Sequence, residues 1–345
     1  MLCGVVGAGN WMRSALLPAL LAQKECKVVG CAAANAAEAG AFAQEMGIPR
    51  AFSSLDAMIS EGGKLDLVVL ATPDHAHASG IAAALNAGIA VYCEKPLAND
   101  PQTARELVDL ARKTSVPATV GFSFRFNPAL QALQRDLRAG RLGEPWLIEL
   151  SEHNPQFHPA GGKPLNWKGD PAMARGGALF EYGSHVIDLA NWLLGPIARV
   201  SARFQKILPN ARLDDIATLL FEFRSGATGT LVASWLLDGG FPGIRVRLHG
   251  SKALAEVWVD DRLPGGQRYQ VTPTLDQTPA DQPVAAMGAD YRSDAASRHI
   301  GDFVARVQGR QPEHGTTLPS LEDGAHVQSV MEAALNATAE WADVS

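Results

Sequence analysis

Hydrophobic positions in the first third of the chain form short solid runs, and most runs are followed by a turn and a segment with helical spacing. The runs predict buried strands at Leu2–Val6, Lys27–Ala33, a short stretch near Arg50–Phe52, Leu65–Ala71, Ile89–Cys93 and Pro117–Gly121. Helices are expected through Leu21, from a capping pair of Asn35 and Glu38 to Met46, up to Ala87 and over Pro101–Thr114. Solid apolar strands that alternate with helices are typical of a parallel sheet covered on both faces. The pattern therefore predicts a doubly wound α/β domain of the Rossmann type over residues 1–121.

The pattern changes after Gly121, where apolar and polar residues begin to alternate. An amphipathic helix to about Arg138 precedes strands expected at Trp146–Glu152, Arg199–Ile207, Ala217–Phe223, Gly229–Leu236 and Ile244–His249. Alternation favours a mostly antiparallel open sheet with one covered face, so residues 122–345 are expected to form a second, α+β domain. Residues 272–288 should form a long surface loop, and Ser320 should cap a final helix that runs to about Trp341.

The apolar positions of this second sheet should be covered by helices or by another subunit. Candidates for that face are Val200, Ala202, Phe204, Leu231, Ala233 and Trp235. Burial by a second copy would make the protein a homodimer or homotetramer.

Charge and composition exclude several classes of partner. The chain has 345 residues, a net charge of -6 and no basic block, so no nucleic-acid partner is expected. No charged leader or long apolar run appears, which argues against a membrane and for a cytoplasmic location. The four cysteines form no CxxC pair and are expected to be reduced core residues, so no metal site is predicted.

The turn after the first strand carries the first candidate chemistry. Gly7 and Gly9 allow a tight bend and let backbone amides approach a pyrophosphate at a helix N-terminus. Met12 stands where a third glycine is usual, which makes the motif weak when taken alone. The second strand ends at Ala33, where an acid commonly binds the adenosine ribose and repels a 2'-phosphate. The absence of that acid, with Arg13 as the only close cation by sequence, predicts dual cofactor use with a slight lean to NADP.

Lys95 lies at the carboxyl end of an expected strand, where ligands bind in open parallel sheets. Its ammonium can donate a hydrogen bond to a substrate oxygen, although a solvated charge pair of Glu94 and Lys95 at a loop is the commoner role for such residues. Pro96 follows, and we expect the Lys95-Pro96 bond to be cis.

A second candidate follows two glycines at Gly176-Gly177. A helix from Glu181 to Leu194 would place Glu181 and His185 four residues apart on one face. A carboxylate beside an imidazole raises the basicity of the ring, as a general base requires, with an exposed surface pair as the alternative. His75 and His77 are two residues apart and do not share a helical face, so a metal pair there is not expected.

These motifs taken in order resemble the glucose-fructose oxidoreductase, inositol dehydrogenase and MocA family over essentially the whole chain. The resemblance is carried by Gly7-Ala8-Gly9, Thr72-Pro73-Asp74-His75-Ala76-His77, Glu94-Lys95-Pro96, Arg125-Phe126-Asn127-Pro128 and the segment from Gly176 to Asp188. It implies a dinucleotide-binding domain joined to a sheet domain that usually drives dimer or tetramer formation. It also implies that Lys95 binds the reacting oxygen, that His185 exchanges its proton and that Glu181 orients substrate and base. Position 181 is usually Asp in the family, so the longer Glu181 implies a different accepted ring size or carbon.

The candidate cofactor-binding residues are Gly7, Gly9, Asn10, Trp11, Met12, Arg13, Ala33, Ala71, Thr72, Pro73, His77, Glu94, Lys95, Pro96 and Arg125. The candidate substrate-binding residues are Lys95, Arg125, His153, Trp167, Glu181 and His185.

The leading hypothesis is an NAD(P)-dependent oxidoreductase that transfers a hydride between nicotinamide and a sugar, polyol or related cyclic compound. One alternative is a glycoside-cleaving relative that keeps NAD bound and uses a transient oxidation to allow elimination. Another is a non-catalytic regulator that senses a nucleotide or sugar. A metal-dependent hydrolase using His153, His158, His185 and Glu181 is disfavoured because no HxxxH or HExxH spacing is present.

Overall fold

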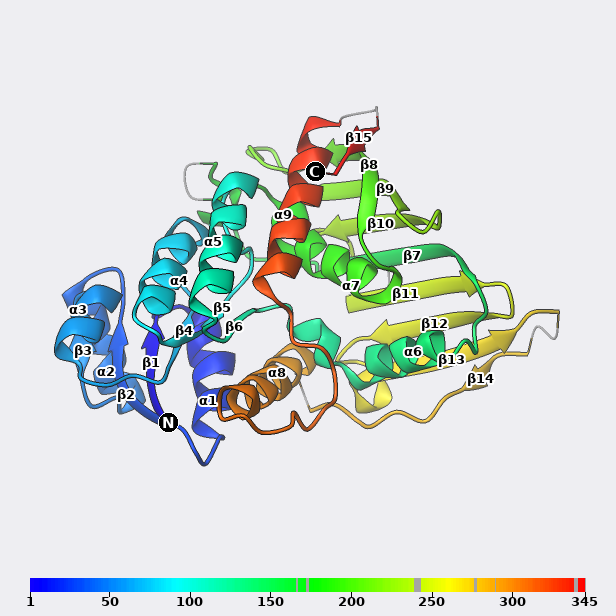
Figure 1. The fold of residues 1–345 in the computed structure, drawn as a ribbon. Helices are drawn as coiled ribbons and strands as arrows, with labels where there is room; N and C mark the ends of the chain where they lie inside the picture. The colour runs from blue at the N-terminus through cyan, green and yellow to red at the C-terminus, as the bar shows by residue number, and fades with distance from the viewer. Residues whose placement is uncertain are drawn as a thin grey trace. The chain divides into compact units, whose positions relative to one another are not determined.

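The computed structural model describes residues 1–165, 167–171, 174–238, 243–275, 278–288, 290–337 and 341–344. The chain divides into two compact units (Figure 1). The first unit comprises Met1–Phe126 and Arg292–Gln328, and the second comprises Asn127–Tyr291 and Ser329–Ser345. The first unit thus runs to Phe126 and also includes residues 292–328, which lie within the expected second domain at 122–345.

The first unit contains a six-stranded parallel sheet in the order β3-β2-β1-β4-β5-β6. Its strands are β1 (Leu2–Val6), β2 (Lys27–Ala32), β3 (Ala51–Phe52), β4 (Leu67–Leu70), β5 (Ala90–Cys93) and β6 (Ala118–Val120). This strand order is that of the dinucleotide-binding Rossmann fold, and the expected fold class is confirmed.

Helices connect these strands, and several begin at side-chain caps that the sequence indicates. The segments are η1 (Met12–Leu16), α1 (Leu17–Leu21), α2 (Ala36–Met46), α3 (Leu55–Glu61), η2 (Asp74–Ala76), α4 (His77–Asn86), α5 (Pro101–Thr114) and η3 (Ser123–Phe126). Asn35, Ser54 and Asp100 each accept a hydrogen bond from a backbone amide in the first turn of the helix that follows. Such caps satisfy amide groups that have no partner within the helix.

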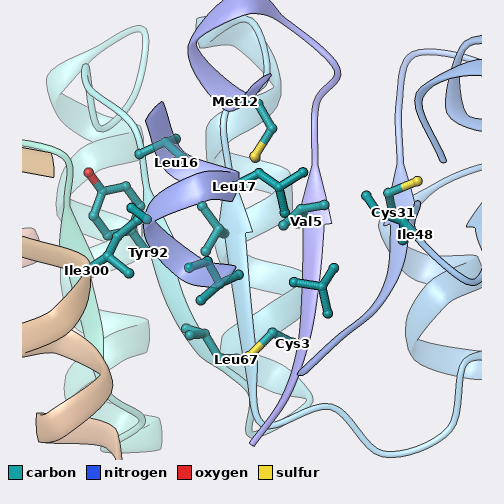
Figure 2. Packing of buried hydrophobic residues seen from close by; sticks show 14 of the residues in the cluster. Cys3, Val5, Met12, Leu16, Leu17, Cys31, Ile48, Leu67, Tyr92 and Ile300 are labelled. Atoms are coloured by element: carbon teal, nitrogen blue, oxygen red, sulfur yellow. The ribbon is translucent and has the colours of Figure 1, made fainter. Parts of the chain in front are cut away.

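The core of the first unit lies between β1, β4, β5 and the first helix, and a late part of the chain completes it (Figure 2). Ile300 and Phe303, from α8 (Tyr291–Val307), are buried in the same cluster as Leu16 and Tyr92. Burial of this apolar stripe explains why residues 292–328 pack with the first unit, since exposing it would cost the transfer free energy of several large side chains.

The second unit contains a nine-stranded sheet in the order β14-β13-β12-β11-β7-β10-β9-β8-β15. Its strands are β7 (Pro145–His153), β8 (Ile197–Gln205), β9 (Ile216–Phe223), β10 (Thr228–Ser234), β11 (Gly243–Gly250), β12 (Ala253–Val259), β13 (Gln267–Pro273), β14 (Ala280–Asp281) and β15 (Ala342–Asp343). All neighbouring pairs are antiparallel except β7 and β10. The expected, mostly antiparallel sheet is confirmed.

One face of this sheet is covered within the chain. The remaining helical segments of the second unit include α6 (Pro128–Arg138), η4 (Trp167–Gly169), η5 (Leu179–Gly183), α7 (Ser184–Leu194) and η6 (Pro264–Gly266). In Figure 1, α6 and α7 lie over the sheet, with α6 against β12 and β13 and α7 against β7. Val200, Ala202, Leu231, Ala233 and Trp235 are buried, whereas Phe204 is only partly buried. The five buried positions are therefore covered within the single chain and do not need a second subunit for their burial.

The opposite face is polar and carries charge pairs. Strand register places Leu220, Thr230, Glu149, Arg247 and Glu256 in one row across five neighbouring strands. Arg247 lies 2.9 Å from a carboxylate oxygen of Glu149 and 2.9 Å from one of Glu256. Cross-strand pairs of opposite charge stabilise a sheet face that contacts water.

Two expectations for the end of the chain need correction, namely the extent of the surface loop and the end of the last helix. The predicted surface loop begins later, because Thr272 and Pro273 still pair with β12, and Ala280–Asp281 pairs with β13. The last helix, α9 (Leu321–Asn336), begins with the expected reciprocal cap between Ser320 and Asp323 but does not reach Trp341. No helix within the described ranges combines the length and hydrophobicity needed to cross a membrane.

Candidate active site

The glycine turn after β1 is shaped by a close approach of the backbone. Gly7 has a φ of +102°, and a Cβ atom at this position would lie 2.2 Å from the carbonyl oxygen of Ala71. Any other residue would therefore push β1 and β4 apart. At Gly9 an added Cβ atom would meet no other atom within 4 Å, so the backbone there borders open space. Both glycines of the predicted turn are thus explained, one by packing and one by access.

A buried hydroxyl lies beside this turn. The Oγ1 atom of Thr72, two residues after β4, is buried and has no hydrogen-bond partner among the described residues. Buried polar atoms normally have a partner, so this hydroxyl indicates a missing polar group. An open glycine turn and an unsatisfied hydroxyl at the carboxyl ends of adjacent parallel strands fit the polar part of a dinucleotide cofactor.

Glu94 connects the end of β5 to the glycine turn. Its Oε1 atom accepts a hydrogen bond from Trp11 Nε1 at 3.0 Å and another from the hydroxyl of Tyr92 at 3.3 Å. A Cβ atom at Gly121 would lie within 2.9 Å of this carboxyl group, so a glycine there leaves room for it. Burial raises the pKa of Glu94, while Lys95 and the Trp11 donor act in the opposite direction. Glu94 is therefore held inside a network rather than in the solvated pair that we considered for it.

His77 holds the segment that carries Lys95. Its Nδ1 atom lies 2.6 Å from the carbonyl oxygen of Pro96, and its Nε2 atom lies 2.9 Å from that of Thr72. Burial lowers the pKa of the ring. The two carbonyl contacts raise this pKa, but by less than burial lowers it. The Lys95-Pro96 peptide is cis, as predicted. His77 thus links the chain after β4 to the chain after β5, a role that its position in the sequence did not indicate.

The adenosine-binding candidates lie at the end of β2 and on the first helix. Ala33 comes directly after β2 and is partly exposed. The guanidinium of Arg13 donates through Nε to the carbonyl oxygen of Ala8 at 2.9 Å, and it also pairs with Glu45 and lies over the ring of Phe42. The side chain of Met12 points into the core, which explains why a third glycine is absent.

Arg125 occupies an interior position of the first unit. It is 2% exposed, and its Nη1 atom lies 3.1 Å from Oδ2 of Asp323. The same Asp323 oxygen accepts the backbone amide of Ser320 at 2.8 Å. The contact with Asp323 therefore ties η3 to the start of α9, while the cofactor and substrate contacts expected for Arg125 stay predictions.

Glu181 and His185 lie on consecutive helical segments of the second unit. Glu181 is in the π-helical turn η5, and His185 is in the first turn of α7. Because a π-helical turn is wider than an α-helical turn, the side chains at 181 and 185 differ in angular spacing from the α-helical expectation. Both side chains are partly exposed.

Asp214 fixes the start of this helical segment. Its carboxylate accepts hydrogen bonds from the backbone amides of Gly177 and Leu179, each at 2.8 Å. A Cβ atom at Gly177 would lie 1.9 Å from the carbonyl oxygen of Asp214, so only glycine permits this approach. Burial raises the pKa of Asp214, and the two amide donors act in the opposite direction. The Asp-Asp pair at 214–215 before β9 was the only available sequence signal, and we did not recognise it.

Lys168 and Gln156 are two further residues that the sequence analysis missed. The Nζ atom of Lys168 lies 2.5 Å from Oε1 of Glu181, and Nε2 of Gln156 donates to the hydroxyl of Tyr182 at 2.6 Å. Both come from the stretch 154–169, which lacks a periodic pattern and so gave no indication of its contacts.

The remaining candidates in the second unit are His153 and Trp167. His153 is the last residue of β7, burial lowers its pKa, and its Nε2 atom has no hydrogen-bond partner in the described part of the chain. Trp167 begins η4, but its side chain lies outside the described residues. Among the residues that the structure describes, no three His, Cys, Asp or Glu side chains are grouped to hold a metal ion.

The contacts therefore gather two sets of candidates. In the first unit, Trp11, Thr72, His77, Glu94 and Pro96 are joined by hydrogen bonds around Lys95. In the second unit, Glu181 is joined to Lys168. Lys95 and Arg125 belong to the first unit, whereas His153, Glu181 and His185 belong to the second.

Solved structures with the same fold cover nearly the whole chain. Levoglucosan dehydrogenase in complex with NADH and L-sorbose has a TM-score of 0.87 at 23% identity, covering 100% of this chain and 99% of that one. An oxidoreductase domain protein from Kribbella flavida has a TM-score of 0.86 at 24% identity, covering 99% of this chain and 98% of that one. At these identities the likeness concerns the fold alone.

Curated relatives are similar in sequence. Inositol 2-dehydrogenase of Rhizobium meliloti is 26% identical over 352 residues, which cover 99% of this chain and 98% of the relative. D-apiose dehydrogenase of Paraburkholderia graminis is 29% identical over 240 residues, which cover 69% of this chain and 62% of the relative.

Two family descriptions match separate parts of the chain. Residues 1–122 match the oxidoreductase family with an NAD-binding Rossmann fold, and residues 130–256 match the GFO/IDH/MocA C-terminal domain. The two matches together cover more than half of the sequence, and they agree with the parallel and mixed sheets described above. The chain therefore belongs to the GFO/IDH/MocA family of oxidoreductases.

Proposed function

We infer that this protein is an NAD(P)-dependent dehydrogenase or reductase that acts on a hydroxyl or ketone group of a sugar, polyol or related cyclic compound. The observation that carries this inference is the position of Lys95. It follows β5 at the carboxyl end of the sheet that also bears the Gly7 and Gly9 turn, and His77 and Glu94 hold the adjoining backbone. An ammonium group held beside a dinucleotide site is suited to bind the reacting oxygen of a substrate.

The chemistry divides among three side chains in this proposal. A bound nicotinamide supplies the hydride acceptor or donor. Lys95 donates a hydrogen bond to the reacting oxygen and stabilises the negative charge that develops on it. His185 accepts the hydroxyl proton during oxidation and returns it during reduction, and Glu181 orients the substrate and the imidazole. The glycine turn, Thr72 and the residues after β5 bind and orient the cofactor.

Named relatives support the substrate class. Proteins similar to this chain are named inositol 2-dehydrogenase, levoglucosan dehydrogenase and D-apiose dehydrogenase. All three names refer to polyhydroxylated compounds without a charged group.

The choice between NAD and NADP depends on Ala33 and Arg13. Ala33 offers no carboxylate to repel a 2'-phosphate. Arg13 pairs with Glu45, whose side chain is 58% exposed. Because an exposed ion pair contributes little free energy, Arg13 can exchange Glu45 for a phosphate at small cost. We therefore propose dual cofactor use with a slight preference for NADP.

Oligomeric state and location are parts of the same proposal. The polar face of the second sheet exposes the apolar side chain of Leu220 and carries Arg245 and Arg247, and arginine is enriched at interfaces between proteins. We propose a homodimer or homotetramer in the cytoplasm. Sedimentation at micromolar concentration tests the assembly, and a monomer would contradict it.

The decisive experiment is a substrate panel. Purified protein is incubated with sugars and polyols and with NAD or NADP, and the absorbance of reduced nicotinamide is followed. Steady release of reduced cofactor supports a dehydrogenase. Cleavage of a glycoside without such release would indicate the oxidation-elimination alternative. Ligand binding without turnover on any member of the panel would favour a regulator and overturn the proposal.

A further inference from the structure

Lys168 and Glu181 form an ion pair in the second unit, and the proposed reaction uses Glu181 but not Lys168. The side chains are 27% and 25% exposed, so both groups remain in contact with solvent but are largely covered. Lys168 comes from the short segment η4, and Glu181 comes from the first turn of η5. An ion pair in this partly covered setting is screened less than one on an open surface.

The backbone around the pair is fixed at several points. Gln156 donates to the hydroxyl of Tyr182, the residue next to Glu181, so the stretch 154–169 is attached to η5 near both of its ends. The side chain of Phe157 packs edge-on against Trp235, with ring centroids 5.3 Å apart. On the other side, Asp214 accepts the amide of Leu179. These contacts hold η5, which carries Glu181, and join the start of the stretch 154–169 to it.

The hydrogen bond between Lys168 and Glu181 uses one donor of the ammonium group and one acceptor position of the carboxylate. An ammonium group has three donors, and a carboxylate has about four acceptor positions. A substrate hydroxyl can donate to Glu181 and accept from Lys168 at the same time. A substrate carboxylate can only accept, and the negative charge of Glu181 repels it.

The nearby charged groups include one further ion pair and one exposed cation. Asp170 lies two residues after Lys168, and one of its oxygens is 3.5 Å from Nη1 of Arg212. Lys163 is exposed in the same stretch of chain and provides a cation outside the pair. The positive charge of Lys168 is thus offset directly by Glu181, and the two together present no net charge.

We propose that Lys168 is a specificity-determining residue, and that its pairing with Glu181 selects neutral hydroxylated substrates against the corresponding sugar acids. This inference rests on the proposed function, because it assumes that Glu181 faces the substrate. Glu181 supplies the acceptor and rejects anions, while Lys168 supplies the donor and holds the Glu181 carboxylate in place.

The test compares matched neutral and acidic sugars by direct binding, which does not require turnover. Dissociation constants are measured by ligand-observed NMR for D-glucose against D-glucuronate and for D-galactose against D-galacturonate, with full-length protein saturated with NADH. The wild type should bind the neutral member of a pair at least about 10-fold more tightly.

Five variants separate charge from geometry. Glu181→Gln keeps the size of the side chain but removes its charge, which leaves Lys168 uncompensated. The ratio should then shift by about 10-fold or more toward the acid. Glu181→Asp keeps the charge but shortens the reach by one methylene, so neutral sugars should bind more weakly while acids stay excluded. Lys168→Met should weaken neutral binding several-fold, with the conservative Lys168→Arg restoring most of it. Lys163→Met removes the same charge from the same stretch and should change nothing.

The outcomes distinguish this inference from the proposed function. An unchanged ratio in Glu181→Gln, equal effects of Lys168→Met and Lys163→Met, or no binding of any of the four sugars to the wild type would overturn the role of Lys168. Each of these results is compatible with steady NAD(P)H release on another substrate, which would leave the dehydrogenase assignment in place. Melting temperatures of all variants identify any loss of binding that is due to misfolding.

Discussion

The imidazole of His77 lies 2.6 Å from the carbonyl oxygen of Pro96, across two neighbouring strand ends of the first unit. The same ring contacts the carbonyl oxygen of Thr72 at 2.9 Å. One buried side chain therefore joins the chain that follows β4 to the backbone that carries Lys95. The orientation of Lys95 should depend on this ring.

Replacing His77 by Phe keeps an aromatic ring but removes both contacts. A neutral imidazole donates to one of the two carbonyl oxygens, so one buried carbonyl group would lose its donor, at a cost of about 1–3 kcal/mol of folding free energy. Displacement of Lys95 should lower kcat/KM by roughly 10-fold or more. The matched control is His75→Phe at the exposed neighbouring position, which should behave as the wild type. Full activity in His77→Phe would show that Lys95 is positioned without this ring.

Lys95 and His185 should be the chemical pair. Lys95→Met and His185→Ala should each lower kcat by roughly 10²-fold or more, because each removes acid-base assistance to the reacting oxygen. Affinity for the cofactor, measured by quenching of protein fluorescence, should stay nearly unchanged. Turnover similar to the wild type in either variant would refute the assignment of that residue.

Removal of the Asp214 carboxylate should loosen the start of the segment that carries Glu181. Asp214→Ala leaves the amides of Gly177 and Leu179 without their acceptor, which should cost about 1–3 kcal/mol of stability and reduce turnover. Asp281→Asn affects an exposed partner of Arg268 and should change stability by less than about 0.5 kcal/mol. Denaturant titration of both variants provides the measurement, and equal midpoints would contradict this role of Asp214.

His299 should make the stability of the protein depend on pH. The ring is buried, its Nε2 atom lies 2.9 Å from Thr119 Oγ1, and its Nδ1 atom has no hydrogen-bond partner among the described residues. Thr119 itself donates to the carbonyl oxygen of Pro319, so its oxygen accepts from a neutral His299 ring. Burial, assisted by the positive charge of Arg125, lowers the pKa of His299 from 6.5 to about 3.

The direction of the effect follows from proton binding. Between pH 6.5 and about 3 the unfolded chain holds a proton on this ring and the folded chain does not, so stability falls as the pH drops through that window. His77 acts in the same direction, because burial also lowers its pKa. In His299→Gln, the fall in the free energy of unfolding across this pH window should be smaller by a few kcal/mol at most, because one pKa unit corresponds to about 1.4 kcal/mol. Melting temperatures at several pH values test it, and parallel curves for the variant and the wild type would contradict the assignment.

Cofactor preference should respond to three single substitutions. Ala33→Asp introduces an acceptor for the ribose hydroxyls and should shift the ratio of kcat/KM toward NAD by roughly 10-fold or more. Glu45→Gln frees Arg13 and should shift the ratio toward NADP, whereas Arg13→Gln should shift it toward NAD. The readout is kcat/KM with each cofactor. A strong wild-type preference for NAD, or no shift in Ala33→Asp, would show that position 33 does not face the ribose.

The sequence by itself determined the architecture, because periodicity and caps are local properties. Solid apolar runs specified buried parallel strands, and alternation specified a sheet with one covered face. The cap at Asn35 and the reciprocal cap between Ser320 and Asp323 appear where the residue types predicted them. The cis peptide before Pro96 also follows the local pattern.

Only the tertiary structure decided which residues support the candidate chemistry. Asp214 and Gly177 are far apart in the chain, as are His77 and Pro96, and a periodic pattern carries no information about such pairs. The partner of Glu181 comes from the stretch 154–169, whose sequence has no periodic pattern. Helix α8 packs into the core of the first unit, and the apolar positions of its sequence do not show which core they join. A strand can be predicted from the repeat of apolar positions in its own sequence. A hydrogen bond between distant segments forms only when the whole chain has folded and brought them together, so the local sequence does not predict it.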